Sequence, residues 1–152
     1  MSYPALRELV PHSGPMVLLD KVLLADEESL SAEVTIRASS MFCDGSGVAA
    51  WVGIEYMAQA IAAHAGFLAR QRGDAVKVGF LLGARRYQAS TALFALGSVL
   101  VVRITRVLQG ENGLAAFECS IHDSAMLAGV ALAHATITVF QPDDVAEFIQ
   151  EM

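Results

Sequence analysis

Apolar and polar residues alternate along several stretches of the chain, and this alternation is typical of half-buried β-strands. The clearest stretch is 30–37, in which Leu, Ala, Val and Ile alternate with Ser, Glu, Thr and Arg. An apolar segment, Met16 to Leu24, precedes it, and Asp26-Glu27-Glu28 lies between the two. The pattern therefore predicts an antiparallel hairpin in the first quarter of the chain.

The second half of the chain contains four more segments with the character of strands. A turn sequence, Gly110-Glu111-Asn112-Gly113, separates the middle two and is suited to a hairpin. We therefore expect a second group of antiparallel strands, at Val76 to Tyr87, Val99 to Leu108, Leu114 to Ile121 and Val130 to Phe140.

One long helix is predicted between the two groups of strands, from Val48 to Arg70. Ser46 or Gly47 provides its start and Gly73 its end. Alanine and larger apolar residues surround this segment on nearly all sides, and such a helix is buried on most sides.

The order of two strands, one long helix and four strands predicts an α+β fold in which an antiparallel sheet wraps around the helix. A short helical turn at Pro4 to Leu9 and a short closing helix after Pro142 complete the expected elements. No repeat or linker divides the sequence, so we expect one domain over residues 1–152.

Composition limits the class of partner. Ten Lys and Arg residues against 16 Asp and Glu give a net charge of −6, which argues against a nucleic-acid surface. Hydrophobic residues make up 55% of the chain, so we expect at least a dimer. Cys43 and Cys119 form no disulfide framework and the N-terminus has no secretion signal, so we expect a cytoplasmic protein.

Neither of the two most apolar stretches has the features of a membrane span. The first, Val48 to Ala69, contains Glu55, Gln59 and His64. The second, Ala125 to Phe140, is shorter than the roughly 20 residues that a spanning helix needs. No spacing of His, Cys, Asp and Glu suggests a metal site, and no glycine-rich loop suggests a nucleotide, so we expect no cofactor.

Three motifs resemble those of a known family. The segment 9–22, with Leu9-Val10-Pro11-His12 before an apolar strand that ends Asp-Lys-Val, resembles the opening of the beta-hydroxyacyl-acyl carrier protein dehydratases. Residues 55–59 resemble their helix motif Glu-x-Met-Ala-Gln, and 79–87 with 96–98 resemble their later strand and turn. The combination of 50–55 with 80–87 is similar to the divergent dehydratase subunits encoded with aryl polyene pigment biosynthesis.

The resemblance implies the hotdog fold and a site centred on Glu55. Dehydration of a 3-hydroxyacyl thioester needs a base for the α-proton and an acid for the departing hydroxyl. On its apolar helix, Glu55 is suited to be the protonated acid. The family places a loop histidine before the helix, and the matching position here is Met41. Either another residue supplies the base or the subunit is inactive; the candidate base is His12, in the loop that matches the family.

Other residues are expected around the substrate. The resemblance implies that the amide of Ala50, at the helix start, binds the thioester carbonyl. Gln59, one turn after Glu55, either holds that carboxylate or satisfies the backbone of a neighbouring strand. Cys43 is expected to be an ordinary thiol rather than a nucleophile. The expected pocket walls are Phe42, Phe80, Leu82 and Gly83.

A group of basic residues is expected to bind a carrier protein. An acyl carrier protein is acidic and carries a phosphopantetheine phosphate, so clustered cations could attract it. The alternative is an ordinary solvated strand face. The candidates are Arg70, Arg72, Lys77, Arg85 and Arg86.

The resemblance thus implies a dehydratase that converts 3-hydroxyacyl-acyl carrier protein to the trans-2-enoyl thioester. The alternatives are a non-catalytic hotdog subunit that pairs with an active paralogue, which Met41 favours, and a hotdog thioesterase. We expect a homodimer or a heterodimer with a paralogous dehydratase, in which strand edges near Val76 to Tyr87 pair across chains.

Overall fold

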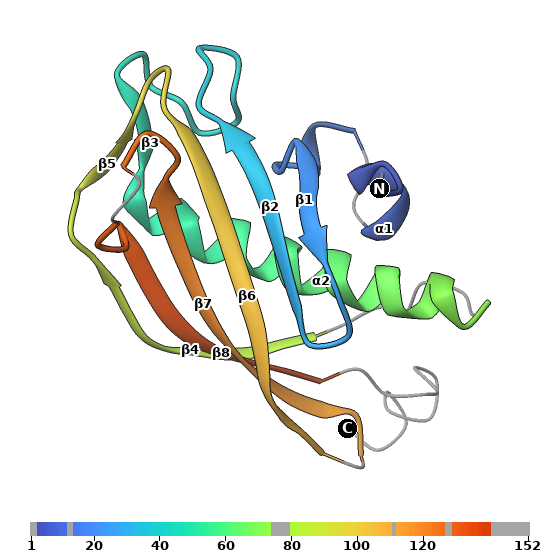
Figure 1. The fold of residues 1–152 in the computed structure, drawn as a ribbon. Helices are drawn as coiled ribbons and strands as arrows, with labels where there is room; N and C mark the ends of the chain where they lie inside the picture. The colour runs from blue at the N-terminus through green and yellow to red at the C-terminus, as the bar shows by residue number, and fades with distance from the viewer. Residues whose placement is uncertain (1–2, 12–13, 74–79, 111, 127–128, 141–152) are drawn as a thin grey trace.

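A computed structural model of the chain describes residues 3–11, 14–73, 80–110, 112–126 and 129–140; the side chains of 80–82, 84 and 85 are outside this description. Figure 1 shows one long helix, α2, lying across a single face of a curved antiparallel sheet. The α+β arrangement predicted from the pattern is confirmed.

The main sheet has six strands, all antiparallel, in the order β1-β2-β6-β7-β8-β4. The first hairpin and the second group of strands both lie within a few residues of their predicted positions. In this order β1 and β4 are the two edge strands. The strands are β1 (Lys21–Ala25), β2 (Ser29–Thr35), β4 (Phe80–Ala89), β6 (Val99–Gln109), β7 (Leu114–Asp123) and β8 (Ala133–Phe140).

The alternation of apolar residues determines which face of the sheet the helix covers. Alternate residues of β6, β7 and β8 are buried, and their neighbours are exposed or half-buried; β2 follows the same pattern except that Ser31 is also buried. Each large apolar side chain buried in this way contributes roughly 1.5–3 kcal/mol to folding. The core residues on this face include Leu30, Val34, Val102, Ile104, Ile121 and Ile137.

Helix α2 (Gly53–Gln71) follows a 3-10 turn, η2 (Ala50–Val52), and therefore begins later than the sequence predicts. Residues 47–49 are not helical but form β3 (Gly47–Ala49), which pairs with β5 (Leu93–Ala95). Strands of three residues are too short to show a period, so the sequence pattern did not reveal them. Gly73, with φ of 74°, ends the helix as predicted.

The N-terminal segment packs beside α2. It contains α1 (Leu6–Leu9), as expected, and a 3-10 turn, η1 (Gly14–Met16), where the sequence predicts the start of a strand. The expected closing helix after Pro142 lies outside the described residues. No described helix has the length and apolar character needed to cross a membrane.

Candidate active site

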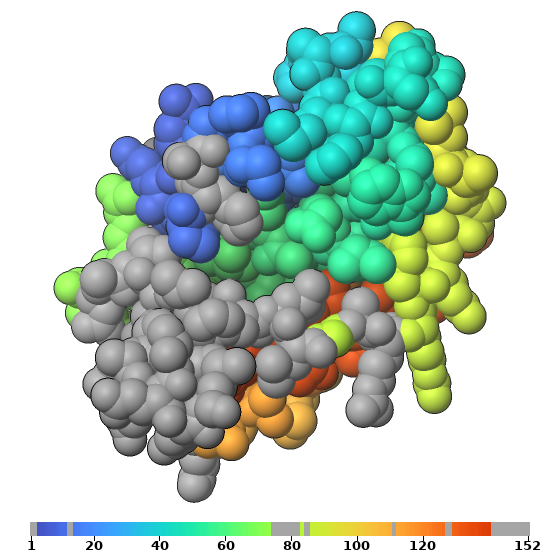
Figure 2. Space-filling model, turned by 180° about the vertical axis from the view of Figure 1, so that it is seen from behind, coloured from blue at the N-terminus to red at the C-terminus, as the bar shows by residue number. Residues whose placement is uncertain are grey.

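Glu55 lies in the first turn of α2 on a side of the helix that the sheet does not cover. We call this side, together with Trp51 of the preceding turn η2, the open face. Its residues are exposed or half-buried, and they are Trp51, Ile54, Glu55, Ala58, Ala62 and Ala65. Figure 2 shows green α2 at the surface between the blue N-terminal segment and the yellow-green strand β4. The helix is buried on most sides, as expected, but its own chain does not bury the Glu55 carboxylate.

Two aromatic residues pack together at the helix start, one turn before Glu55. Trp51 is 61% exposed, and its ring meets the ring of Phe42 edge-on, with centroids 5.8 Å apart. Phe42 is 48% exposed and has φ of 69°, which is strained for a residue with a side chain. Such strain often occurs at functional sites. Met41, in the position of the missing histidine, therefore lies next to a strained residue that packs against Trp51.

The backbone at the start of the helix is already engaged. The Ala50 amide donates to the carbonyl of Ala92 at 3.0 Å, as an extension of the β3–β5 pairing. It is therefore not free for a thioester carbonyl, contrary to the role that the resemblance implied. The sequence could not reveal this because the acceptor lies on a distant segment.

Tyr87 of β4 fixes the same turn from the other side. Its hydroxyl donates to the Ala50 carbonyl, and burial raises the pKa of Tyr87 to about 12, so the hydroxyl remains a donor at neutral pH. Gly53 permits this approach because a Cβ there would lie 2.3 Å from the Tyr87 oxygen. Arg86, with φ of 56°, lies where the pairing of β4 with β8 is irregular. Sequence reasoning did not identify Tyr87.

Gln59 uses both ends of its amide on backbone atoms and none on Glu55. Its Nε2 donates to the Met16 carbonyl at 2.5 Å, and its Oε1 accepts from the Leu18 amide at 2.9 Å. Of the two roles left open by the sequence, the structure supports the backbone role. The expectation that Gln59 binds substrate is therefore not supported, because its hydrogen-bonding groups hold the segment 16–18 against the helix.

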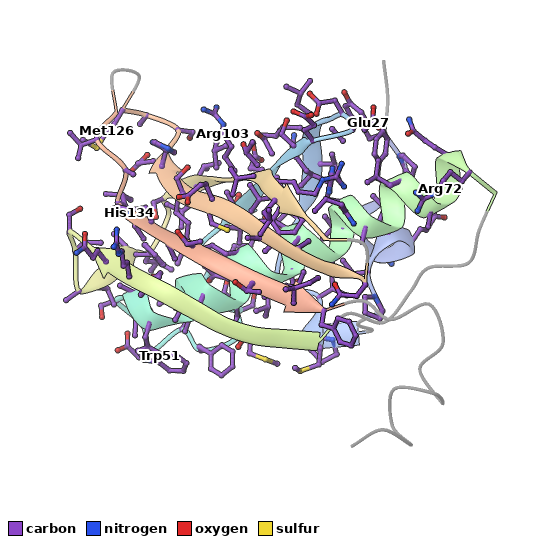
Figure 3. All side chains as sticks on the ribbon, turned by 90° about the horizontal axis from the view of Figure 1, so that it is seen from below. Glu27, Trp51, Arg72, Arg103, Met126 and His134 are labelled. Carbon is purple, nitrogen blue, oxygen red and sulfur yellow. The ribbon has the colours of Figure 1, made fainter. Side chains whose placement is uncertain are left out.

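The described histidines do not lie at Glu55. His64, farther along α2, is buried and directs Nε2 at the carbonyls of Asp26 and Glu27, 3.0 and 3.1 Å away. His122 is on β7, and His134 lies on the exposed side of β8 (Figure 3). The candidate base, His12, lies outside the described residues.

The expected basic cluster is divided between two ends of the molecule. Arg70 and Arg72 are at the C-terminal end of α2, where Arg70 bonds Glu8 at 3.1 Å. Arg86 precedes Tyr87, which contacts the N-terminal end. A helix of 19 residues is about 28 Å long, so these cations do not form one patch. Figure 3 shows Arg72 and Trp51 at opposite ends of the fold. Lys77 and the side chain of Arg85 lie outside the description.

The structure describes some of the other residues that the sequence predicts around the pocket, together with Cys43. Gly83 is half-buried on β4, and a Cβ there would meet nothing within 4 Å, so it faces open space. The side chains of Phe80 and Leu82 are outside the described part. Cys43 is half-buried. Within the described residues, no group of three or more His, Cys, Asp or Glu could hold a metal ion.

Comparison with known proteins decides the family. The model of ApeP-like proteins, described as ApeP dehydratase, matches residues 4–150. The chain belongs to this ApeP-like dehydratase family. A solved structure, the dehydratase heterocomplex ApeI:P from Xenorhabdus doucetiae, is 30% identical with a TM-score of 0.86, and the match covers 97% of each chain.

More distant structures share the fold. Zebrafish thioesterase superfamily member 2 is 13% identical with a TM-score of 0.67, and 90% of this chain and 92% of that chain are covered. A hypothetical thioesterase from Streptococcus pneumoniae, solved with coenzyme A, is 15% identical with a TM-score of 0.62. The match covers 80% of this chain and 84% of that chain. The comparison with curated proteins returned no match. The fold is the hotdog that the sequence motifs implied.

Proposed function

We propose that this ApeP-like chain is a catalytic subunit of a hotdog dehydratase that converts 3-hydroxyacyl-acyl carrier protein to trans-2-enoyl thioester in aryl polyene biosynthesis. We further propose that it works as a heterodimer with a paralogous hotdog chain. The heterocomplex formed by its 30% identical relative supports this pairing. Within this chain, the supporting observation is the position of Glu55 on the open face of α2.

The reaction requires two proton transfers at one substrate. A base removes the α-proton, the C–O bond at the β-carbon breaks, and an acid protonates the departing hydroxyl, which leaves as water. Glu55 is the proposed acid. The base is a histidine, either His12 of this chain or one from the paralogue, because no described histidine of this chain lies at Glu55.

The open face explains why a partner is needed. A carboxylate serves best as an acid when it is shielded from water, and here the single chain leaves it exposed. A partner packed over Trp51 and Phe42 would bury Glu55 and enclose the acyl chain. The edge strand β4 is the proposed pairing surface, since no described strand pairs with its outer edge and such an edge has hydrogen-bonding groups to satisfy.

A second candidate role is a non-catalytic subunit that completes the tunnel of an active paralogue. Met41 favours it, because a thioether at the family's histidine position cannot take a proton. In that role Glu55 would be dispensable for turnover.

Purified chain, alone and together with its paralogue, should be given 3-hydroxyacyl-acyl carrier protein, and enoyl product and free thiol should be measured by mass spectrometry. We expect enoyl product in the mixture. Glu55→Gln should lower the rate by about 100-fold or more, and His12→Ala should do the same if His12 is the base. Because Glu55 is exposed in the single chain, its replacement should leave the fold intact.

The matched control is Glu27→Gln, an exposed carboxylate at the other end of the fold (Figure 3). It should retain the normal rate. Full activity of the Glu55→Gln heterodimer would select the non-catalytic role, and release of free thiol would select a thioesterase.

A further inference from the structure

The turn that carries Glu55 has no anchor in its own sequence. Helices usually begin at Ser, Thr, Asp or Asn, whose side chain accepts a backbone N–H. Here the residues before η2 and α2 are Ala49 and Val52, and neither forms a side-chain cap hydrogen bond. A 3-10 turn also has poorer hydrogen-bond geometry than an α-helix. The start of the helix therefore depends on contacts from other segments.

Distant segments hold the Ala50 peptide group on both of its sides. Its amide donates to the Ala92 carbonyl at 3.0 Å, and Ala92 lies in the connection from β4 to β5, which passes the start of α2 (Figure 1). Its carbonyl accepts the Gly53 amide and the Tyr87 hydroxyl. Among these partners, Tyr87 is the one that bonds through its side chain. Its hydroxyl can therefore be removed without changing any backbone bond.

The backbone of β4 is distorted where it presents Tyr87. Between its pairs with Thr136 and His134 of β8, strand β4 has one residue more than β8 has. A shift of one residue moves a side chain to the other face of a sheet, so this bulge lets Tyr87 face the helix. The bulge requires φ of 56° at Arg86, a strained value for a residue with a side chain. Bulges and strain of this kind occur often beside active sites.

We propose that Tyr87 is a positioning residue for the dehydration: by holding the Ala50 carbonyl, its hydroxyl fixes the first turn of α2 in the geometry that presents the Glu55 carboxyl to the substrate. The inference rests on the proposed function and extends it to a residue on β4. Tyr87 acts through Glu55 and not on the substrate itself. Displacing a catalytic group by about 1 Å can lower a rate about 100-fold, so one hydrogen bond at this turn should matter for turnover.

Tyr87→Phe removes the hydroxyl and keeps the ring. With the heterodimer and 3-hydroxyacyl-acyl carrier protein, we expect kcat to fall about tenfold and KM to change by less than about twofold, because a misplaced acid slows proton transfer and leaves substrate binding intact. The rates are measured at a temperature at which circular dichroism shows the variant to be fully folded. A purely structural role would leave both constants unchanged under these conditions and would overturn the proposal.

A double-mutant cycle shows whether Tyr87 acts through Glu55. When Glu55→Gln is already present, adding Tyr87→Phe should lower the residual rate by less than about twofold, since the carboxyl that Tyr87 positions is gone. A further loss of about tenfold would mean that Tyr87 acts by another route, and the proposal would then be wrong.

Tyr3→Phe is the matched control. It also removes a hydroxyl from a tyrosine that contacts α2, but the Tyr3 ring packs on Phe67, far from Glu55 along the helix. It should leave kcat and KM unchanged. An equal fall of kcat in this variant would overturn the assignment, because the loss would then not be specific to the first turn.

Amide hydrogen exchange separates this inference from the proposed function. With the isotope-labelled chain followed by NMR, Tyr87→Phe should speed exchange at residues 53–55 about five- to tenfold and leave residues 64–70 unchanged, because one hydrogen bond is lost at the helix start alone. If the Glu55→Gln heterodimer is fully active, the proposed function fails, and exchange still decides whether Tyr87 fixes the turn. Unchanged exchange at residues 53–55 would reject the inference even if dehydration is confirmed.

Discussion

At the scale of single residues, the same type of side chain has different roles according to what surrounds it. Tyr87 donates to a backbone carbonyl and fixes the helix start, whereas Tyr56, which is buried and also protonated at neutral pH, forms no hydrogen bond with a described residue. Likewise, Glu55 is exposed while Gln59, one turn later, is buried under the segment it binds.

His64 should make stability depend on pH. Burial lowers the pKa of this histidine below its usual 6.5, so the unfolded chain binds more protons than the folded chain. Stability should therefore be full above about pH 6.5 and decline as the pH falls below it. Urea unfolding at about pH 7.5 and about pH 5 measures the loss, which His64→Gln should reduce.

Two other groups bear on this measurement. The pKa of His122 is also lowered, chiefly by burial. Part of the dependence of the unfolding free energy on pH should therefore remain in the His64→Gln variant. The pKa of Asp26 is lowered by the backbone amides of Glu28 and Ser29, and its effect begins only below pH 3.8. An unchanged slope in His64→Gln would show that His64 is not the cause.

Arg86 is the described basic residue of the expected cluster that lies toward the Glu55 end of α2. If it attracts the carrier protein there, Arg86→Glu should raise KM for carrier-bound substrate about fivefold and leave KM for the pantetheine thioester unchanged, because only the carrier is acidic. Arg103→Glu, on the outer face of the sheet (Figure 3), is the control. If Arg86→Glu raised KM for the pantetheine thioester as well as for the carrier-bound substrate, a role of Arg86 in carrier docking would be contradicted.

At the scale of elements, α2 is held by close backbone contacts at positions where side chains are absent. A Cβ at Gly66 would lie 1.9 Å from the Leu9 carbonyl oxygen, so α1 rests directly on the helix backbone. Together with the Gln59 bonds to Met16 and Leu18, this contact joins the N-terminal segment to α2.

Gly66→Ala should therefore destabilise the protein by about 1–3 kcal/mol, although alanine is the better helix former by about 1 kcal/mol. Denaturant unfolding measures this change. Ala62→Gly on the open face gives the effect of helix propensity alone, a loss of about 1 kcal/mol. A stabilised Gly66→Ala variant would rule out the close packing of α1 on α2.

At the scale of the whole molecule, the described residues leave one side of the helix exposed, and no described strand pairs with the outer edge of β4. The open face of α2 bears exposed Trp51 beside exposed Phe42, and β4 ends the sheet on one side. Both features favour an assembly in which a second hotdog chain covers Glu55.

Trp51 can report that assembly, because it is the single tryptophan of the chain. Its ring should pass from water to an apolar environment, so its fluorescence should shift to shorter wavelength when the paralogue is added. A Trp51→Phe variant subtracts any signal from the partner. Association without a shift, with the complex confirmed by native mass spectrometry, would place the interface elsewhere.

Much of this architecture follows from local sequence. The alternation in 30–37 and in the later strands identifies the core face because a strand's side chains alternate by geometry. Gly73 ends the helix because its φ of 74° suits glycine. The motif at 55–59 placed Glu55 on the helix and indicated the family, since a short motif needs no knowledge of distant contacts.

Only the tertiary structure decided what each of these groups contacts. The Ala50 amide pairs with Ala92, and the Gln59 amide with Met16 and Leu18, because folding brings distant segments to the helix. The helix is apolar nearly all round, so its composition could not indicate which side the sheet leaves open. The sequence by itself determined the long helix, the strands of the main sheet and the family, whereas packing between distant segments determined the short strands β3 and β5, the exposure of Glu55 and the partners of Ala50 and Gln59.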